Sequence, residues 1–128
     1  MRFPFGFDPR YTRYLSVLGI RPDRAWVELD DQRLEARFGP WHLSTPVDNI
    51  ASTCITGPYA SAFKAIGPRI SLADRGLSFG SNTERGVCIL FREPVPGRST
   101  LGVVKHPGLT VTVADVDGLA TAIEKLPR

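Results

Sequence analysis

The sequence predicts a mainly β (α+β) fold, in which about six to seven short antiparallel strands form a small barrel or sandwich and a helix is added at each end. Two observations predict it. Short segments in which apolar and polar residues alternate recur through the middle of the chain, and turn residues separate them. Later, residues 109–113 alternate in the same way and residues 116–126 carry an apolar stripe at helical spacing, so a strand leads into a helix that can cap the barrel.

The length of 128 residues predicts a single domain, 1–128, with one core. No long uncharged apolar run occurs and no secretory h-region follows Met1, so we expect a cytoplasmic protein. Only three of the 16 basic residues are lysines, which indicates a GC-rich bacterial genome. Cys54 and Cys88 each fall in a predicted strand, and we expect buried core residues there, not a disulfide or a nucleophile.

Residues 1–24 are predicted to form an N-terminal aromatic arm followed by a helix. Phe3, Phe5 and Phe7 place a large apolar area in a short segment, and we expect it to lie in a groove on the domain or across a homodimer interface. An arm that engages a partner is the functional alternative. An Asp-Pro pair then provides an N-cap and a proline at the first helical position, which predicts a helix over about 9–18.

The net charge of +3 lies in this N-terminal segment, because basic and acidic residues cancel over the remainder of the chain. Arg10 and Arg13 stand on the predicted helix and, with the three phenylalanines, are the candidate partner-binding residues. A basic segment suits anionic lipid or an acidic protein surface, while a solvated, ion-paired helix face is the simpler interpretation. Nucleic-acid binding is disfavoured because the rest of the chain carries no net charge.

Residues 25–126 are predicted to form the barrel and its capping helix. Segments 25–30 and 33–38 alternate around a polar turn, which predicts a hairpin with one wet face. A short extended piece at 41–45 ends at a proline. After a turn with two apolar anchors, residues 51–56 predict a further strand.

The second half of the barrel is predicted from turn chemistry. Residues 60–67 suggest one helical turn, and 69–72 with 77–79 predict a hairpin whose loop ends in glycine, as a G1 bulge requires. Residues 87–91 are apolar on both faces, which favours a central strand. Residues 92–107 hold three prolines and two glycines, so we expect a surface loop.

The C-terminal helix has a start signal, a stripe and an end signal. Asp115 or Asp117 can cap its N-terminus, where the negative charge also suits the helix dipole. Pro127 ends it. The stripe that needs a partner surface comprises Val116, Leu119, Ile123 and Leu126.

The run of short strands, the turn at Pro46–Ile50 and the ending at 109–119 resemble bacterial pleckstrin-homology-like (PH-like) domains. The resemblance covers about residues 25–126 and implies a strand-built barrel capped by the final helix. The N-terminal aromatic helix and an insertion at 57–67 depart from the simplest members of that family.

No catalytic motif, phosphate loop or metal spacing is present in the sequence. His42 and His106 have no ligating neighbour at i+2 to i+5, and the glycine turns do not precede a helix, so we expect no metal and no cofactor. Arginines flanking the second hairpin could gather on one rim and bind a phosphorylated headgroup, although exposed turn arginines are the simpler interpretation. These are Arg69, Arg75, Arg85 and Arg92.

Three functions follow from these observations. The leading hypothesis is a non-catalytic binding module of PH-like type that recognises a protein or peptide through the phenylalanines or an open barrel edge. The first alternative is an adaptor at anionic lipid surfaces that uses the basic N-terminal segment. The second is a small β-barrel ligand carrier or enzyme with a cavity near Cys54, His42 and Trp41.

Overall fold

The computed structural model describes residues 1–59, 66–70, 75–99 and 102–126. The described part is mainly β, with a short N-terminal helix and a C-terminal helix. Single-turn 3₁₀ segments occur at Pro22–Arg24 and Val47–Asn49. The strands and helices follow the chain as β1 (Arg2–Pro4), α1 (Pro9–Val17), β2 (Ala25–Leu29), β3 (Arg33–Phe38), β4 (Trp41–Pro46), β5 (Ile50–Thr56), β6 (Gly67–Ile70), β7 (Leu77–Gly80), β8 (Gly86–Ser99), β9 (Gly102–Val111) and α3 (Val116–Glu124).

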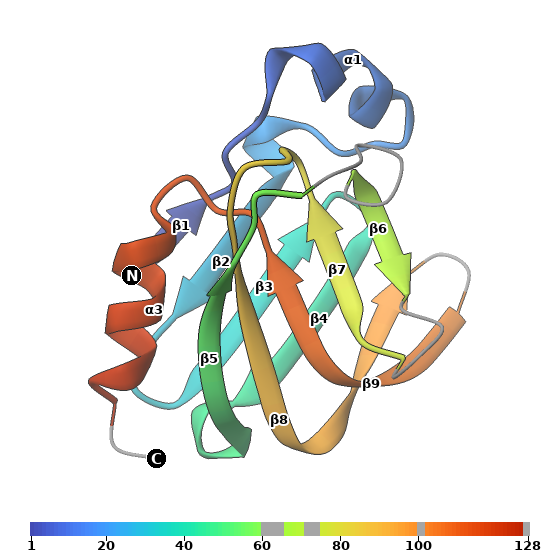
Figure 1. The fold of residues 1–128 in the computed structure, drawn as a ribbon. Helices are drawn as coiled ribbons and strands as arrows, with labels where there is room; N and C mark the ends of the chain where they lie inside the picture. The colour runs from blue at the N-terminus through green and yellow to red at the C-terminus, as the bar shows by residue number, and fades with distance from the viewer. Residues whose placement is uncertain (60–65, 71–74, 100–101, 127–128) are drawn as a thin grey trace.

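The strands form one sheet of nine, in the order β1-β2-β3-β4-β8-β9-β7-β6, with β5 paired to β8 off this path. The long strand β8 serves both parts of the sheet, because its C-terminal end pairs with β4 and its N-terminal half pairs with β5. Neighbouring strands are antiparallel except β7 and β9, which are parallel. In Figure 1 the part from β1 to β4 lies behind β5, β8, β9 and β7.

The sequence predicted a barrel or sandwich of about six to seven strands, and the structure differs from this in two respects. Among the described residues the sheet has nine strands, and it does not close into a barrel. Beyond β1, the isolated bridge between Phe5 and Val113 links the first part of the sheet to the segment that follows β9. The mainly β class and the two terminal helices are confirmed.

The core lies between the two parts of the sheet and is joined by an aromatic stack. The ring of Phe38 on β3 lies 4.9 Å from that of Phe5 and 5.1 Å from that of Phe79 on β7, measured between centroids. Both distances suit favourable ring contacts. All three side chains are buried, so the stack spans the core from one part of the sheet to the other.

The N-terminal aromatic segment is a strand and part of the core. Phe3 lies opposite Val27 in the β1–β2 pair, and Phe3 and Phe5 are only 6% and 5% exposed. Phe7 is half-buried and packs against the core. Phe3 and Phe5 are therefore not on an exposed arm and offer no surface to a partner or a dimer interface, because β2 and the segment after β9 hold their backbone inside the sheet.

The expectation of a surface loop at 92–107 is wrong. These residues form the end of β8 and the start of β9, paired from Val95 opposite His106 to Ser99 opposite Gly102. Pro94 and Pro96 stand two residues apart, so their missing N–H groups fall on one edge of the strand and the ladder tolerates them. The side chains of Val95 and His106 are buried.

Both predicted helices are present, and each begins with the predicted acidic cap. Asp8 accepts a hydrogen bond from the Arg10 amide at 3.0 Å, and Asp115 accepts one from the Gly118 amide at 3.0 Å. A Cβ atom at position 118 would meet the Asp115 carboxylate in its capping position, so a larger residue there would require this side chain to shift. No helix of the described residues is long and apolar enough to cross a membrane.

The two predicted hairpins are also present, as β2–β3 and β6–β7. In the second, the left-handed backbone conformation falls on Arg75, with φ of 66°, and not on the following glycine. Residues 71–74 of its loop, and most of the helical turn expected at 60–67, lie outside the described residues.

The capping role of α3 gives a stability prediction. Leu119 is fully buried, so Leu119→Ala should lower the free energy of unfolding by about 2–5 kcal/mol through lost burial and a cavity. Chemical denaturation followed by circular dichroism measures it. Leu18→Ala is the matched control, because Leu18 is 37% exposed and should cost far less. Equal losses in the two variants would contradict the packing of α3 described above.

Candidate functional site

The five predicted site residues do not form one patch. Phe3 and Phe5 lie in the core, whereas Arg10 and Arg13 are exposed on α1. Phe7 and Arg10 both line a cleft of about 590 Å³ between residues 6–10, the turn at 82–85 and the segment 113–116, here called the N-terminal cleft. Arg13 is not among its lining residues.

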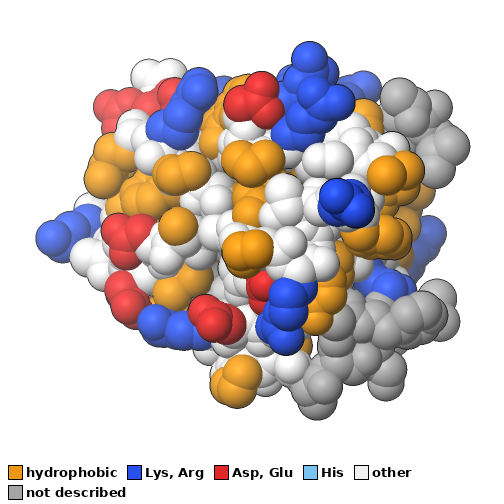
Figure 2. Space-filling view, turned by 90° about the horizontal axis from the view of Figure 1, so that it is seen from above, with side chains coloured by type: hydrophobic (Ala, Val, Ile, Leu, Met, Phe, Trp, Pro, Cys, Tyr) orange, Lys and Arg blue, Asp and Glu red, His pale blue; other side chains and the backbone are white. Residues whose placement is uncertain are grey.

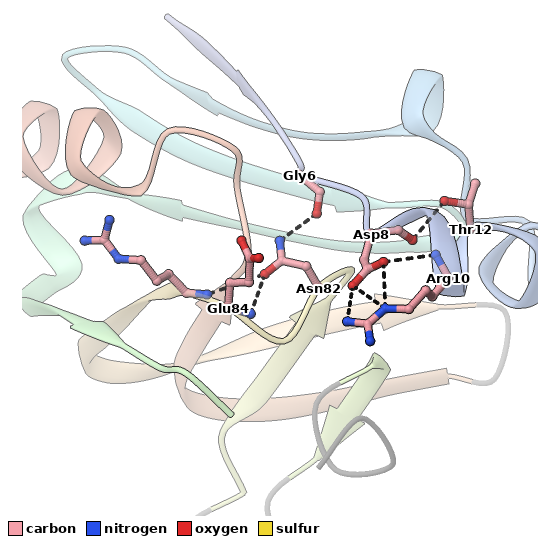
Figure 3. Close-up of polar contacts among 7 residues, drawn as sticks. Gly6, Asp8, Arg10, Thr12, Asn82 and Glu84 are labelled. Atoms are coloured by element: carbon pink, nitrogen blue, oxygen red, sulfur yellow. Dashed lines mark hydrogen bonds and ion pairs between the residues drawn. The ribbon is translucent and has the colours of Figure 1, made fainter. Parts of the chain in front are cut away.

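The wall of the N-terminal cleft is fixed by buried hydroxyl groups. The Ser81 hydroxyl donates to the Gly6 carbonyl at 2.7 Å and lies 2.9 Å from the Thr112 hydroxyl. The Asn82 side-chain amide donates to the same Gly6 carbonyl at 2.6 Å (Figure 3). The side-chain oxygen of Asn82 accepts a hydrogen bond from the Glu84 backbone amide at 2.9 Å, and this bond orders the turn at 82–85. The cleft therefore has a rigid backbone frame.

The two arginines at the cleft each have a carboxylate partner close to them. The Arg10 guanidinium lies 2.8 Å from the Asp8 carboxylate (Figure 3) and the Arg85 guanidinium 3.0 Å from that of Asp117. The hydrogen bonds from the Arg10 side chain and amide lower the pKa of Asp8, and the Asp8 carboxylate raises the pKa of Arg10. Such neutral pairs are poorly suited to capture an anionic headgroup, since each arginine already has a carboxylate partner.

The arginines expected around the second hairpin do not share a rim. Arg85 pairs with Asp117, while the Arg92 Nε donates to the Asp48 carbonyl at 3.0 Å. The two arginines flank a stretch of β8 that spans roughly 20 Å. Arg69 and Arg75 belong to the β6–β7 hairpin. The structure gives no support to a common phosphate site.

A second concave surface lies beside α3. This hollow, of about 670 Å³, is here called the α3 hollow. Its apolar lining comes from Met1, Leu29, Ala122 and Leu126, and its charged rim from Asp30, Asp31, Asp117 and Lys125. The Asp30 carboxylate already has hydrogen-bond partners within the chain. It accepts from the Arg33 and Gln32 amides, and these hydrogen bonds lower the pKa of Asp30.

Strand β5 has one strand neighbour in the described structure, and helix α3 packs against it. It pairs with β8 from Ile50 to Thr56, and no other described strand lies on its second edge. Ala51, Ser52 and Cys54 are exposed, and Ile55 is 42% exposed. The backbone donors and acceptors on this edge therefore have no strand partner among the described residues.

The two histidines serve separate structural contacts. His42 Nε2 lies 3.4 Å from Glu35 Oε1, whereas the buried His106 ring places Nδ1 2.7 Å from the Arg75 carbonyl oxygen. Within the described ranges no group of three or more His, Cys, Asp or Glu could hold a metal ion. Cys54 and His42, which the ligand-carrier alternative places near one cavity with Trp41, pair with opposite ends of β8, roughly 30 Å apart along the strand.

The burial expected for both cysteines is not observed. Cys54 is exposed and Cys88 is half-buried, and neither is in a disulfide. Both side chains belong to the outer face of the sheet, which no described layer covers at this point. The sequence around Cys54 does not alternate, so it carries no signal of which face turns outward.

Comparisons with protein-family models, with curated proteins and with solved structures found no match to this chain.

The Asp8–Arg10 pair gives a pH prediction. Because Arg10 depresses the pKa of Asp8, the stability from this carboxylate is present at neutral pH and is lost as the pH falls through the folded-state pKa. Arg10→Ala should raise the pKa of Asp8 toward its ordinary value, measured by NMR titration of the carboxyl carbon. Arg13→Ala is the control and should leave it unchanged. An unaltered titration in both variants would contradict the pairing.

Proposed function

We propose that this chain is a non-catalytic binding module of PH-like type that takes an extended peptide segment of a partner protein onto the free edge of β5. The observation that carries the proposal is that β5 pairs with β8 alone, so that no described strand occupies its second edge. An extended segment can add to such an edge through backbone hydrogen bonds, as a further strand of the sheet.

The composition of β5 sets it apart from the other short edge strands. β1 contains Arg2 and Pro4, and β6 contains Pro68 and Arg69. Charged residues and prolines discourage unwanted pairing at sheet edges. Residues 51–56 contain neither a charge nor a proline. β5 thus lacks the charged residues and prolines that protect β1 and β6.

The surroundings of β5 suit a peptide with apolar and basic side chains. Helix α3 packs against β5, and the Thr53 hydroxyl donates to Glu124 of α3 at 3.4 Å. Ile55 adds an exposed apolar side chain to the same strand. We therefore propose that an apolar residue of the partner contacts Ile55 and a basic residue contacts Glu124.

The proposal is tested with a displayed library of random linear peptides. Peptides selected on the unaltered protein should bind the Ile55→Lys variant with an affinity about tenfold or more lower, because a lysine on an edge strand discourages pairing with a further strand. They should bind Ile70→Lys as before. Ile70 is the matched control, since it is an isoleucine on the edge strand β6 and is 49% exposed, against 42% for Ile55.

Backbone amide shifts locate the bound peptide. Changes on peptide addition should concentrate in residues 51–56, and circular dichroism should show both lysine variants folded. If no peptide is enriched, or if the selected peptides bind both variants equally, the β5 edge is not a peptide site.

A second candidate, an adaptor at anionic lipid surfaces, is favoured by one observation on α1. Arg13, Tyr14 and Val17 share a face of this helix, and the last two are 57% and 83% exposed. Apolar side chains beside a basic residue suit a membrane interface. This candidate ranks second because Arg2 and Arg10 are already ion-paired. Figure 2, which looks down on the end that carries α1, shows acidic side chains among the basic ones.

Cosedimentation with phosphatidylglycerol vesicles tests this second candidate. Binding should be present at low salt and fall steeply as salt is raised, and Val17→Asp should abolish it. Val103→Asp is the control, because Val103 is also an exposed valine, at 56%, but lies on β9. No sedimentation at low salt, or equal loss in both variants, would exclude α1 as a lipid contact.

A further inference from the structure

Two cysteines meet across the pair of strands β5 and β8. Cys54 lies directly opposite Cys88, in a ladder that continues without a shift from Ser52 opposite Leu90 to Thr56 opposite Gly86. Both residues are thiols. The register is anchored by the neighbouring positions of β8, because Val87 and Ile89 are fully buried in the core.

The positions of the two cysteines suit a disulfide. Residues directly opposite in an antiparallel pair have Cα atoms about 4.5–5.5 Å apart and side chains on the same face. A disulfide spans Cα distances of about 4.4–6.8 Å. A cross-strand bond between Cys54 and Cys88 therefore needs small side-chain adjustments and no change of register.

The surroundings leave this pair open to a small reagent. Val87 and Ile89 face the core, so Cys88 and Leu90, which alternate with them, face outward. Leu90 is 45% exposed and Cys54 is exposed. Cys54 is thus the thiol that a reagent in solution reaches first, and Cys88 is the thiol placed to react with it next.

We propose that Cys54 and Cys88 form a reversible thiol-modification site that is oxidised by low-molecular-weight disulfides. The Cys54 thiolate attacks one sulfur of the reagent, whose S–S bond breaks, and a mixed disulfide forms as one thiolate leaves. The Cys88 thiolate then attacks the Cys54 sulfur and displaces the second thiolate. The two protons of the cysteines end on the released thiols, so the reagent gains two electrons and the cysteine pair loses two.

This inference does not rest on the proposed peptide site. It concerns covalent chemistry on the outer face of β5 and β8 and holds whether or not a partner strand binds. Its consequence is a bond that ties the edge strand to the central strand of the sheet.

The test uses the full chain and oxidised glutathione. Intact mass spectrometry should show the loss of two hydrogens, peptide mapping should show Cys54 joined to Cys88, and dithiothreitol should reverse both. In Cys88→Ser the mixed disulfide at Cys54 should accumulate, because the second thiol is missing. The oxidised protein should also melt at a higher temperature than the reduced protein.

A matched variant tests the register. In the double variant Cys54→Ser with Ser52→Cys, the exposed thiol moves two residues along β5 and faces Leu90, so it is only diagonal to Cys88. This variant should hold a glutathionyl group and fail to close. Closure at the same rate as the unaltered protein would overturn the proposal, and so would a stable mixed disulfide or no reaction in the unaltered protein.

Discussion

The buried hydroxyl of Ser81 holds together parts of the chain that are far apart in sequence. It donates to the Gly6 carbonyl and contacts the Thr112 hydroxyl, so the end of β7, the end of β9 and the N-terminal segment meet at one point. The Asn82 side-chain amide donates to the same Gly6 carbonyl, so two side chains hold this point. Phe5, which lies in the core, precedes Gly6, Gly6 lines the N-terminal cleft, and the Asp8 amide at the start of α1 donates to the Ser81 carbonyl, so all three features are positioned beside this junction.

Strand β8 sets the second constraint. It crosses from one part of the sheet to the other and pairs with β4 at one end and with β5 at the other. β4 and β5 therefore share one side of β8 and take different stretches of it. The same strand places Cys88 opposite Cys54, so β8 fixes both the pairing of β5 and the position of the two cysteines.

The sequence predicted what depends on local pattern and missed what depends on distant pairing. The hairpin at 25–38 and both helix caps were correct, because alternation and capping involve residues close in the chain. The strand in 92–107 was missed, since its prolines indicate a loop unless the opposite strand is known. The strand pairing of Phe3 and the exposure of Cys54 were missed because both depend on partners far along the chain. Membership of the PH-like family remains a prediction.

The pairing of the N-terminal segment has a consequence for how the chain folds as it is made. The Gly6 amide donates to the Thr112 carbonyl, and the Ala114 amide donates to the Pro4 carbonyl. The first strand therefore emerges from the ribosome long before the residues that complete its hydrogen bonds. At a synthesis rate of about 5–20 residues per second, several seconds or more pass between the synthesis of Phe3 and Phe5 and that of residues 112–114, which complete their burial. A chaperone that binds exposed aromatic segments has that interval in which to act.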